Sequence, residues 1–65
     1  MSEFKERLYD ERAQLVEKTE KLEVFLQSNK SNEIGQIQLA LLGIQLPLMK
    51  AYVRVLDERF GRLED

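Results

Sequence analysis

The chain has 65 residues, with 10 Lys and Arg against 12 Asp and Glu, and it contains no Cys and no His. This composition excludes a disulfide framework, the usual zinc, haem and iron–sulfur sites, and the two side chains that most often act as base or nucleophile near neutral pH. The formal net charge of −2 also lacks the basic excess of a nucleic-acid-binding protein. We therefore expect one small domain that is not an enzyme, holds no metal or cofactor and binds no nucleic acid.

The first predicted element is a helix over residues 3–28. This stretch contains no Gly or Pro, and Leu8, Leu15 and Leu22 repeat every seven residues. Such spacing produces a narrow apolar stripe along one side of an amphipathic helix.

A polar cluster at residues 28–32 predicts a turn over 29–32, and Ser31 or Asn32 is expected to cap a second helix over 33–63. Two helices of nearly equal length joined by a short turn form an antiparallel αα-hairpin, so we predict one all-α domain over residues 1–65. Gly43 and Pro47 interrupt the second helix four residues apart. We expect a bend there on the outer face, without a break, because the proline ring crowds only the glycine carbonyl.

Apolar residues cover an unusually wide arc of the second predicted helix. On a helical wheel the arc spans roughly 200°, whereas a surface helix needs about 100°. The first helix offers only a narrow stripe to cover it, so the surplus predicts a homodimer that forms a four-helix bundle, or a higher symmetric oligomer. A foreign protein partner is the main alternative. The candidate interface residues are Leu41, Leu42, Ile44, Leu48, Met49 and Val55.

On the apolar side of each predicted helix, one line of residues spaced seven apart includes polar side chains. We call the two lines together the polar seam. In the second helix it consists of Gln38, Gln45, Tyr52 and Arg59, and in the first of Phe4, Glu11, Lys18 and Phe25. Folding the hairpin about the turn brings Lys18 opposite Gln45 and Glu11 opposite Tyr52.

The polar seam has two readings. One is an internal network of satisfied hydrogen bonds that fixes register and oligomeric state. The other is a pocket at the bundle interface, in which cationic groups hold a phosphate, Tyr52 stacks on a base and Gln45 reads a base edge. The candidate ligand-binding residues are Glu11, Arg12, Lys18, Gln45, Tyr52 and Arg59.

Targeting signals are not evident in the sequence. The first residues are charged almost at once, and the longest uncharged run, residues 34–49, is shorter than a typical transmembrane helix. We therefore expect a cytoplasmic protein that does not bind membranes.

The chain resembles a widespread family of short bacteriophage proteins that fold as helical hairpins. The matching residues are Glu11, Arg12, Leu15, Lys21, Leu22, Phe25, Leu26 and Ser28, followed by Leu41, Leu42, Gln45, Leu46, Met49, Tyr52, Leu56 and Arg59. The resemblance covers residues 8–60, and Pro47 departs from the pattern. It implies a phage or prophage accessory protein that acts in the cytoplasm of the host cell.

Some small helical phage proteins are oligomers that sequester nucleotide-like immune signals, and others dock on a host protein. The resemblance itself implies no known activity, but by analogy with these proteins we predict a non-enzymatic oligomeric binding module that counters host defence by sequestering a small anionic, nucleotide-like ligand. The alternatives are an inhibitor or adaptor that binds a host protein through the apolar face of the second helix, and a purely architectural hairpin.

Overall fold

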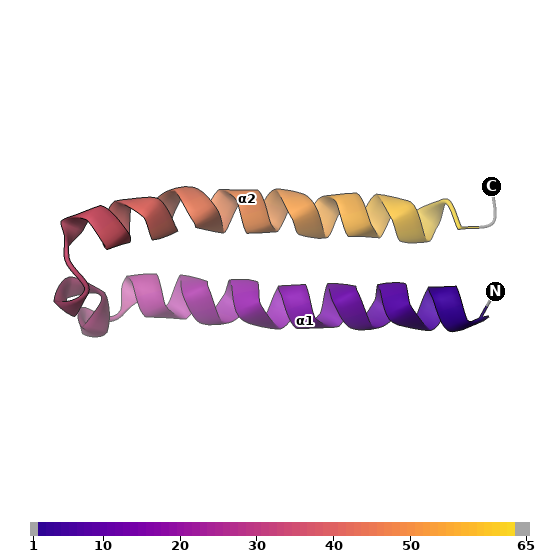
Figure 1. Ribbon diagram of the computed structural model, residues 1–65, viewed down its shortest axis with the longest axis horizontal. Coiled ribbons are helices and arrows are strands. Elements are labelled where there is room, and N and C mark those ends of the chain that lie inside the picture. Colours follow the sequence, from indigo (N-terminus) through magenta and orange to yellow (C-terminus); the bar gives the residue numbers. More distant parts are fainter. Residues whose placement is uncertain (1, 64–65) are drawn as a thin grey trace.

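A computed structural model describes the backbone of residues 2–63 and the side chains of residues 3–63. Helix α1 spans Ser2–Gln27, the short 3-10 helix η1 spans Asn29–Glu33, and helix α2 spans Gln36–Gly61. The two long helices lie side by side and antiparallel, with the turn at one end and both termini at the other (Figure 1). No strand occurs between residues 2 and 63, which confirms the predicted all-α hairpin.

Helix α2 begins at Gln36, three residues later than the sequence predicted. Ser31 does not cap it, because its hydroxyl donates backward to the carbonyl of Ser28, at 2.8 Å. Nor does Asn32, which lies inside η1. The residue before α2 is Gly35, whose φ of 87° reverses the chain in a conformation that favours glycine. The turn is therefore longer than expected, since η1 and Gly35 both precede the helix.

Pro47 lies inside α2, and the helix continues through it without a break. Both Pro47 and Gly43 are exposed, as predicted for the outer face. A Cβ at Gly43 would meet no atom within 4 Å, so this side of the helix is open to solvent.

The core is a single row of side chains between the two helices. Leu8 and Leu56 are the fully buried apolar residues of the described part, at 2% and 0% exposure. Thr19 is also buried, and its hydroxyl donates to the carbonyl of Leu15 at 2.6 Å. The remaining inward apolar residues of α2 are half-buried: Leu39, Leu42, Leu46, Met49, Val53 and Phe60.

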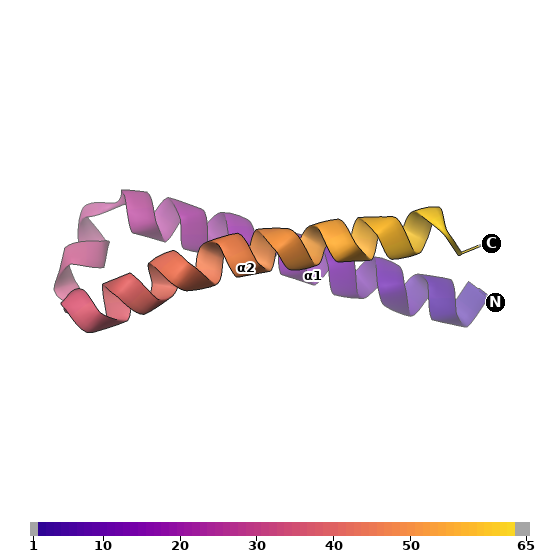
Figure 2. The ribbon, with the colours of Figure 1, turned by 90° about the horizontal axis from the view of Figure 1, so that it is seen from above.

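The molecule is a rod of 45 × 15 × 14 Å with a radius of gyration of 14.9 Å. A compact domain of this length would have a radius of gyration of about 11 Å. In the second view, α2 crosses α1 at a shallow angle along the rod (Figure 2). No third element covers the outer side of either helix within the described residues.

Much of the apolar surface of α2 therefore remains open to solvent. The apolar face, as we call it, consists of Ile37, Leu41, Ile44, Leu48 and Val55, which are between 53% and 77% exposed. The total accessible surface is 5429 Å², whereas a compact monomer of this mass exposes about 4300 Å². The predicted surplus of apolar surface on the second helix is thus present in the single chain.

Two predicted interface residues do not belong to the apolar face. Leu42 and Met49 are half-buried, and they lie fourteen and seven residues before the buried Leu56, respectively. This spacing places them in the row of α2 that packs against α1, so they contribute to the hairpin core. The outward members of the predicted interface are Leu41, Ile44, Leu48 and Val55.

By length and composition alone, α2 is long and apolar enough to cross a membrane. This finding differs from the expectation that no segment of the chain is long enough, which rested on the short uncharged run 34–49. The difference arises because the helix extends well beyond that run, with Lys50 as the first charged residue after it.

Candidate functional site

Glu11 and Tyr52 meet across the two helices, as the polar seam predicted. The phenol O–H of Tyr52 donates to Oε2 of Glu11, from α2 to α1. This hydrogen bond, together with the negative charge of Glu11, raises the pKa of Tyr52 above its ordinary value. The contact fixes the tyrosine ring against α1 while leaving it 43% exposed.

The other polar members of the polar seam form an exposed strip along the hairpin, whereas Phe25 is half-buried. Lys18, Gln38, Gln45 and Arg59 are all exposed, so the single chain does not bury them as the sequence suggested. Gln45 directs its amide along its own helix and donates to Sδ of Met49 at 3.5 Å. The described side chains leave no buried polar atom without a hydrogen-bond partner. A buried network along the polar seam could therefore form only if another surface covered it.

Arg12 lies on the other edge of the hairpin and does not join the polar seam. It forms a hydrogen-bonded ion pair with Asp57, and this contact raises the pKa of the Arg12 guanidinium above its ordinary value. Since consecutive helical residues point about 100° apart, Glu11 and Arg12 contact α2 on opposite sides of the buried row. The structure therefore separates Arg12 from the other predicted ligand-binding residues.

We call this second side the ionic edge, after its two interhelical ion pairs, Arg12–Asp57 and Glu23–Lys50. The Nζ atom of Lys50 lies 2.7 Å from Oε2 of Glu23. Tyr9 and Phe60 pack edge to face near the open end, with ring centroids 6.4 Å apart. A hollow of about 280 Å³ lies along this edge, but Glu23 and Lys50 in its wall already pair with each other.

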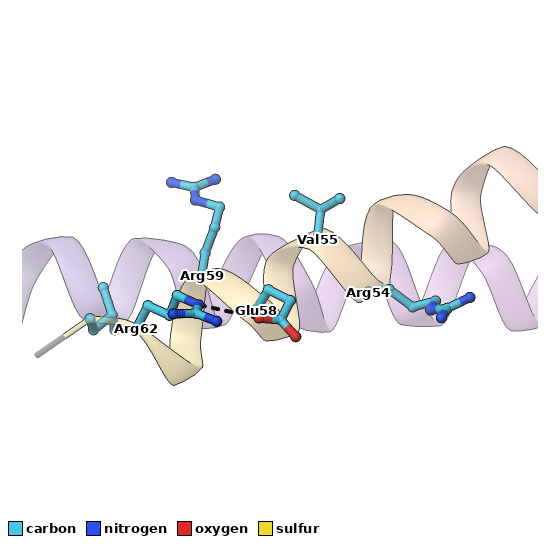
Figure 3. Close-up of a pocket in the computed structure, with 6 residues that line it drawn as sticks. Arg54, Val55, Glu58, Arg59 and Arg62 are labelled. Carbon is cyan, nitrogen blue, oxygen red and sulfur yellow. Dashed lines mark hydrogen bonds and ion pairs between the residues drawn. The ribbon is translucent and has the colours of Figure 1, made fainter. Parts of the chain in front are cut away.

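A larger hollow, of about 510 Å³, lies near the C-terminal end of α2, and we call it the arginine hollow. It is lined by Arg54, Val55, Glu58, Arg59, Arg62 and Leu63. Figure 3 shows Val55 and Arg59 projecting in the same direction, while Glu58 pairs with Arg62 at 3.4 Å. Arg59 therefore continues the apolar face by one helical turn.

Sequence reasoning placed Arg59 among the candidates but missed Arg54 and Arg62. The signal was available, because three arginines occur within nine residues directly after the apolar run. The arginine cluster was not chosen as a site because nearby carboxylates balance its positive charge in the sequence. The structure divides that balance, since Asp57 pairs with Arg12 on the ionic edge and Glu58 is the carboxylate that lines the arginine hollow among the described residues.

The arginine hollow has the chemistry of an anion site. Guanidinium groups bind phosphate and carboxylate oxygens through paired hydrogen bonds, and Val55 and Leu63 supply apolar wall beside them. Among the described side chains, no group of three carboxylates is placed to hold a metal ion. The hollow is consequently suited to a small anion with an apolar or aromatic part.

Fold and surface together define the class of protein: a small all-α hairpin with an exposed apolar face that ends in an arginine hollow. The Sequestin family model matches residues 2–62, and the chain belongs to the Sequestin family. The family name indicates a sequestering role. No curated protein and no solved structure matches the chain.

Proposed function

We propose that this protein is a non-enzymatic sequestering protein that self-associates through the apolar face and binds a small anionic, nucleotide-like ligand. The observation that carries the proposal is the arginine hollow, which continues the exposed apolar face of α2. Membership of the Sequestin family supports the sequestering role.

The proposed ligand follows from the side chains along this side of the hairpin. Arg59 supplies a guanidinium group for phosphate oxygens, and it projects in the same direction as Val55 (Figure 3). Tyr52, one heptad before Arg59, offers an exposed ring on which a base can stack. The Glu11 carboxylate that accepts from Tyr52 has further lone pairs for sugar hydroxyls.

Sequestration at stoichiometric levels suits a protein of this size, because it requires binding without turnover. The family match supports sequestration alone. The resemblance to short phage hairpin proteins leads us to propose that the sequestration counters host defence in the host cytoplasm. The proposed ligand is then a nucleotide-like immune signal.

A second candidate function is docking on a host protein, and the exposure of Leu41, Ile44 and Leu48 favours it. An amphipathic helix can place such a face in the groove of a partner. The two functions differ in what the isolated protein does, since a docking face is free in solution and a self-association face is covered.

Native mass spectrometry of protein purified gently from the cells that produce it tests the main proposal. We expect a dimer or higher oligomer that carries an additional few hundred daltons for each bound nucleotide-like ligand. A monomer that captures one host protein stoichiometrically would instead establish the docking function.

Binding of ADP, a nucleoside diphosphate probe, then tests the arginine hollow. We expect Arg59→Ala to weaken ADP binding about tenfold or more in isothermal titration calorimetry, because it removes a charge-assisted contact. Arg7→Ala is the matched control, since Arg7 pairs with Glu3 on the exposed side of α1. Equal ADP affinity in both variants would exclude Arg59 from the site.

A further inference from the structure

The polar seam places one negative charge between two positive charges. Glu11 accepts the hydrogen bond of the Tyr52 phenol, so a carboxylate lies beside the tyrosine. Arg59 follows Tyr52 by seven residues on α2, and Lys18 follows Glu11 by seven residues on α1. Because the helices are antiparallel, Arg59 lies toward the chain termini and Lys18 toward the turn (Figure 1). Seven helical residues rise about 10 Å, so each cation lies roughly that far along the rod from the contact between Glu11 and Tyr52.

The two cations differ in their surroundings. Arg59 lines the arginine hollow, where it projects in the same direction as Val55 (Figure 3). Lys18 is exposed and lines neither the arginine hollow nor the hollow of the ionic edge. An anion at Arg59 therefore meets a guanidinium group beside apolar wall, whereas an anion at Lys18 meets an ammonium group in open solvent, where an ion pair contributes little.

Glu11 makes the surroundings of Tyr52 unfavourable for a phosphate. A phosphate placed there would lie beside a carboxylate, and like charges repel. The phenol also donates its proton to Glu11, so a phosphate would have to compete for it. The exposed ring of Tyr52 remains available for stacking, which requires no charge.

Both charges already act on the phenol of Tyr52. The hydrogen bond and the negative charge of Glu11 raise its pKa, and the positive charge of Arg59 opposes that shift. The field around the ring is therefore set from two directions, with the favourable position for an anion on the side of Arg59.

From this arrangement we infer that the ligand lies along α2 with a neutral ring over Tyr52 and its phosphates at Arg59, and that Glu11 sets this orientation. The inference rests on the proposed function and adds the charge pattern of the ligand. All phosphates lie at one end of such a ligand, as in a nucleoside diphosphate. A ligand with phosphates on both sides of its sugar would bring one of them toward the Glu11 carboxylate.

Two ligands that differ in where the second phosphate is attached test the charge pattern. ADP carries both phosphates in line at one end, whereas adenosine 3′,5′-bisphosphate carries one on each side of the sugar. We expect the natural chain to bind ADP about tenfold more tightly in isothermal titration calorimetry at low salt, because Glu11 repels the second phosphate of the other ligand.

Glu11→Gln removes the negative charge and keeps the size of the side chain. It should reduce the preference for ADP to within about twofold, because the repulsion is lost. A merely structural role of Glu11 would weaken both ligands equally and leave the preference unchanged. Tyr52→Phe keeps the ring and the Glu11 charge, so it should retain the preference. Glu17→Gln is the matched control, since Glu17 pairs with Lys21 on the exposed surface of α1.

The orientation is tested by removing each cation in turn. Arg59→Ala should weaken ADP binding about tenfold, because it removes a charge-assisted contact. Lys18→Ala should change it by less than about twofold, although Lys18 is equally far from the contact between Glu11 and Tyr52. A loss in Lys18→Ala that equals or exceeds the loss in Arg59→Ala would overturn the orientation.

The outcomes separate this inference from the proposed function. Equal affinity of the natural chain for the two ligands, or a preference for ADP that Glu11→Gln leaves unchanged, would overturn the role of Glu11 while the nucleotide site stands. Binding of neither ligand by the natural chain would overturn both the inference and the nucleotide-like ligand of the proposed function.

Discussion

The two long sides of the hairpin differ in whether one chain completes them. On the ionic edge, Arg12–Asp57, Glu23–Lys50 and the Tyr9–Phe60 ring pair all join α1 to α2. On the opposite side, Tyr52 donates a hydrogen bond to Glu11 across the two helices, beside the exposed apolar face. The ionic edge therefore holds the hairpin together, whereas the side with the apolar face is a surface available for association.

The physical basis of the difference is hydration. Paired charges at the ionic edge are roughly half exposed, so they stay hydrated and lose nothing when no further layer covers them. The apolar side chains on α2 gain free energy only when water is removed, at about 25 cal/mol for each Å². A single chain therefore satisfies the charges of the ionic edge but leaves the apolar face exposed to water.

The largest expected effect comes from removing the core that lies between the two sides. Leu56→Ala should lower the free energy of unfolding by about 2–5 kcal/mol at every protein concentration, because Leu56 is fully buried. Urea unfolding followed by circular dichroism measures it, and a chain this small can lose its fold altogether.

Leu48→Ala makes the same chemical change on the apolar face, where Leu48 is 65% exposed. In dilute protein it should change the free energy of unfolding by less than about 0.5 kcal/mol. At concentrations that favour self-association, Leu48→Ala should lower the free energy of unfolding more, because Leu48 would then be buried against another molecule. An equal loss in dilute protein would mean that Leu48 belongs to the core of the single hairpin.

A smaller effect is expected at the ionic edge. Asp57→Asn removes the partner of Arg12 and should lower the free energy of unfolding only slightly, with the difference shrinking at high salt because the pair is exposed. Thermal unfolding at two salt concentrations measures it. A loss that is independent of salt would indicate a contribution beyond exposed ion pairing.

The smallest effect is on the titration of Tyr52. In a Tyr9→Phe background Tyr52 is the single tyrosine, and its ionisation is visible by ultraviolet absorbance. Replacing Glu11 by Gln should lower the pKa of Tyr52, because it removes the negative charge and the strong acceptor that hold the phenol neutral. An unchanged pKa would mean that the two side chains do not interact in solution.

The same contact gives the stability a pH dependence of defined sign. The folded pKa of Tyr52 lies above its unfolded value, so the contribution of the contact is complete below pH 10 or so. It is then lost as the pH rises through the folded pKa. Comparing Glu11→Gln with the natural chain between neutral and strongly alkaline pH should show the two stabilities converging at the alkaline end.

Sequence pattern alone predicted the hairpin and the contact between Glu11 and Tyr52. The heptad spacing of the leucines and the polar turn required two antiparallel helices, because only one side of each helix could be buried. Register then follows from the turn, and for this reason Glu11 could be placed opposite Tyr52 before the structure showed their hydrogen bond. The wide apolar arc of α2 was likewise a property of spacing alone.

Other features, such as the start of α2 and the partners of individual side chains, follow only from the folded structure. Gly35 and η1 delayed the start of α2, because Ser28 and Ser31 bonded backward to nearby carbonyls. Packing against α1 drew Leu42 and Met49 into the core and sent Arg12 to Asp57. The arginine hollow also depends on the fold, since Asp57 pairs with Arg12 at the ionic edge and does not line the hollow. A side chain's partner depends on its position across two helices, and a single helical wheel does not contain that information.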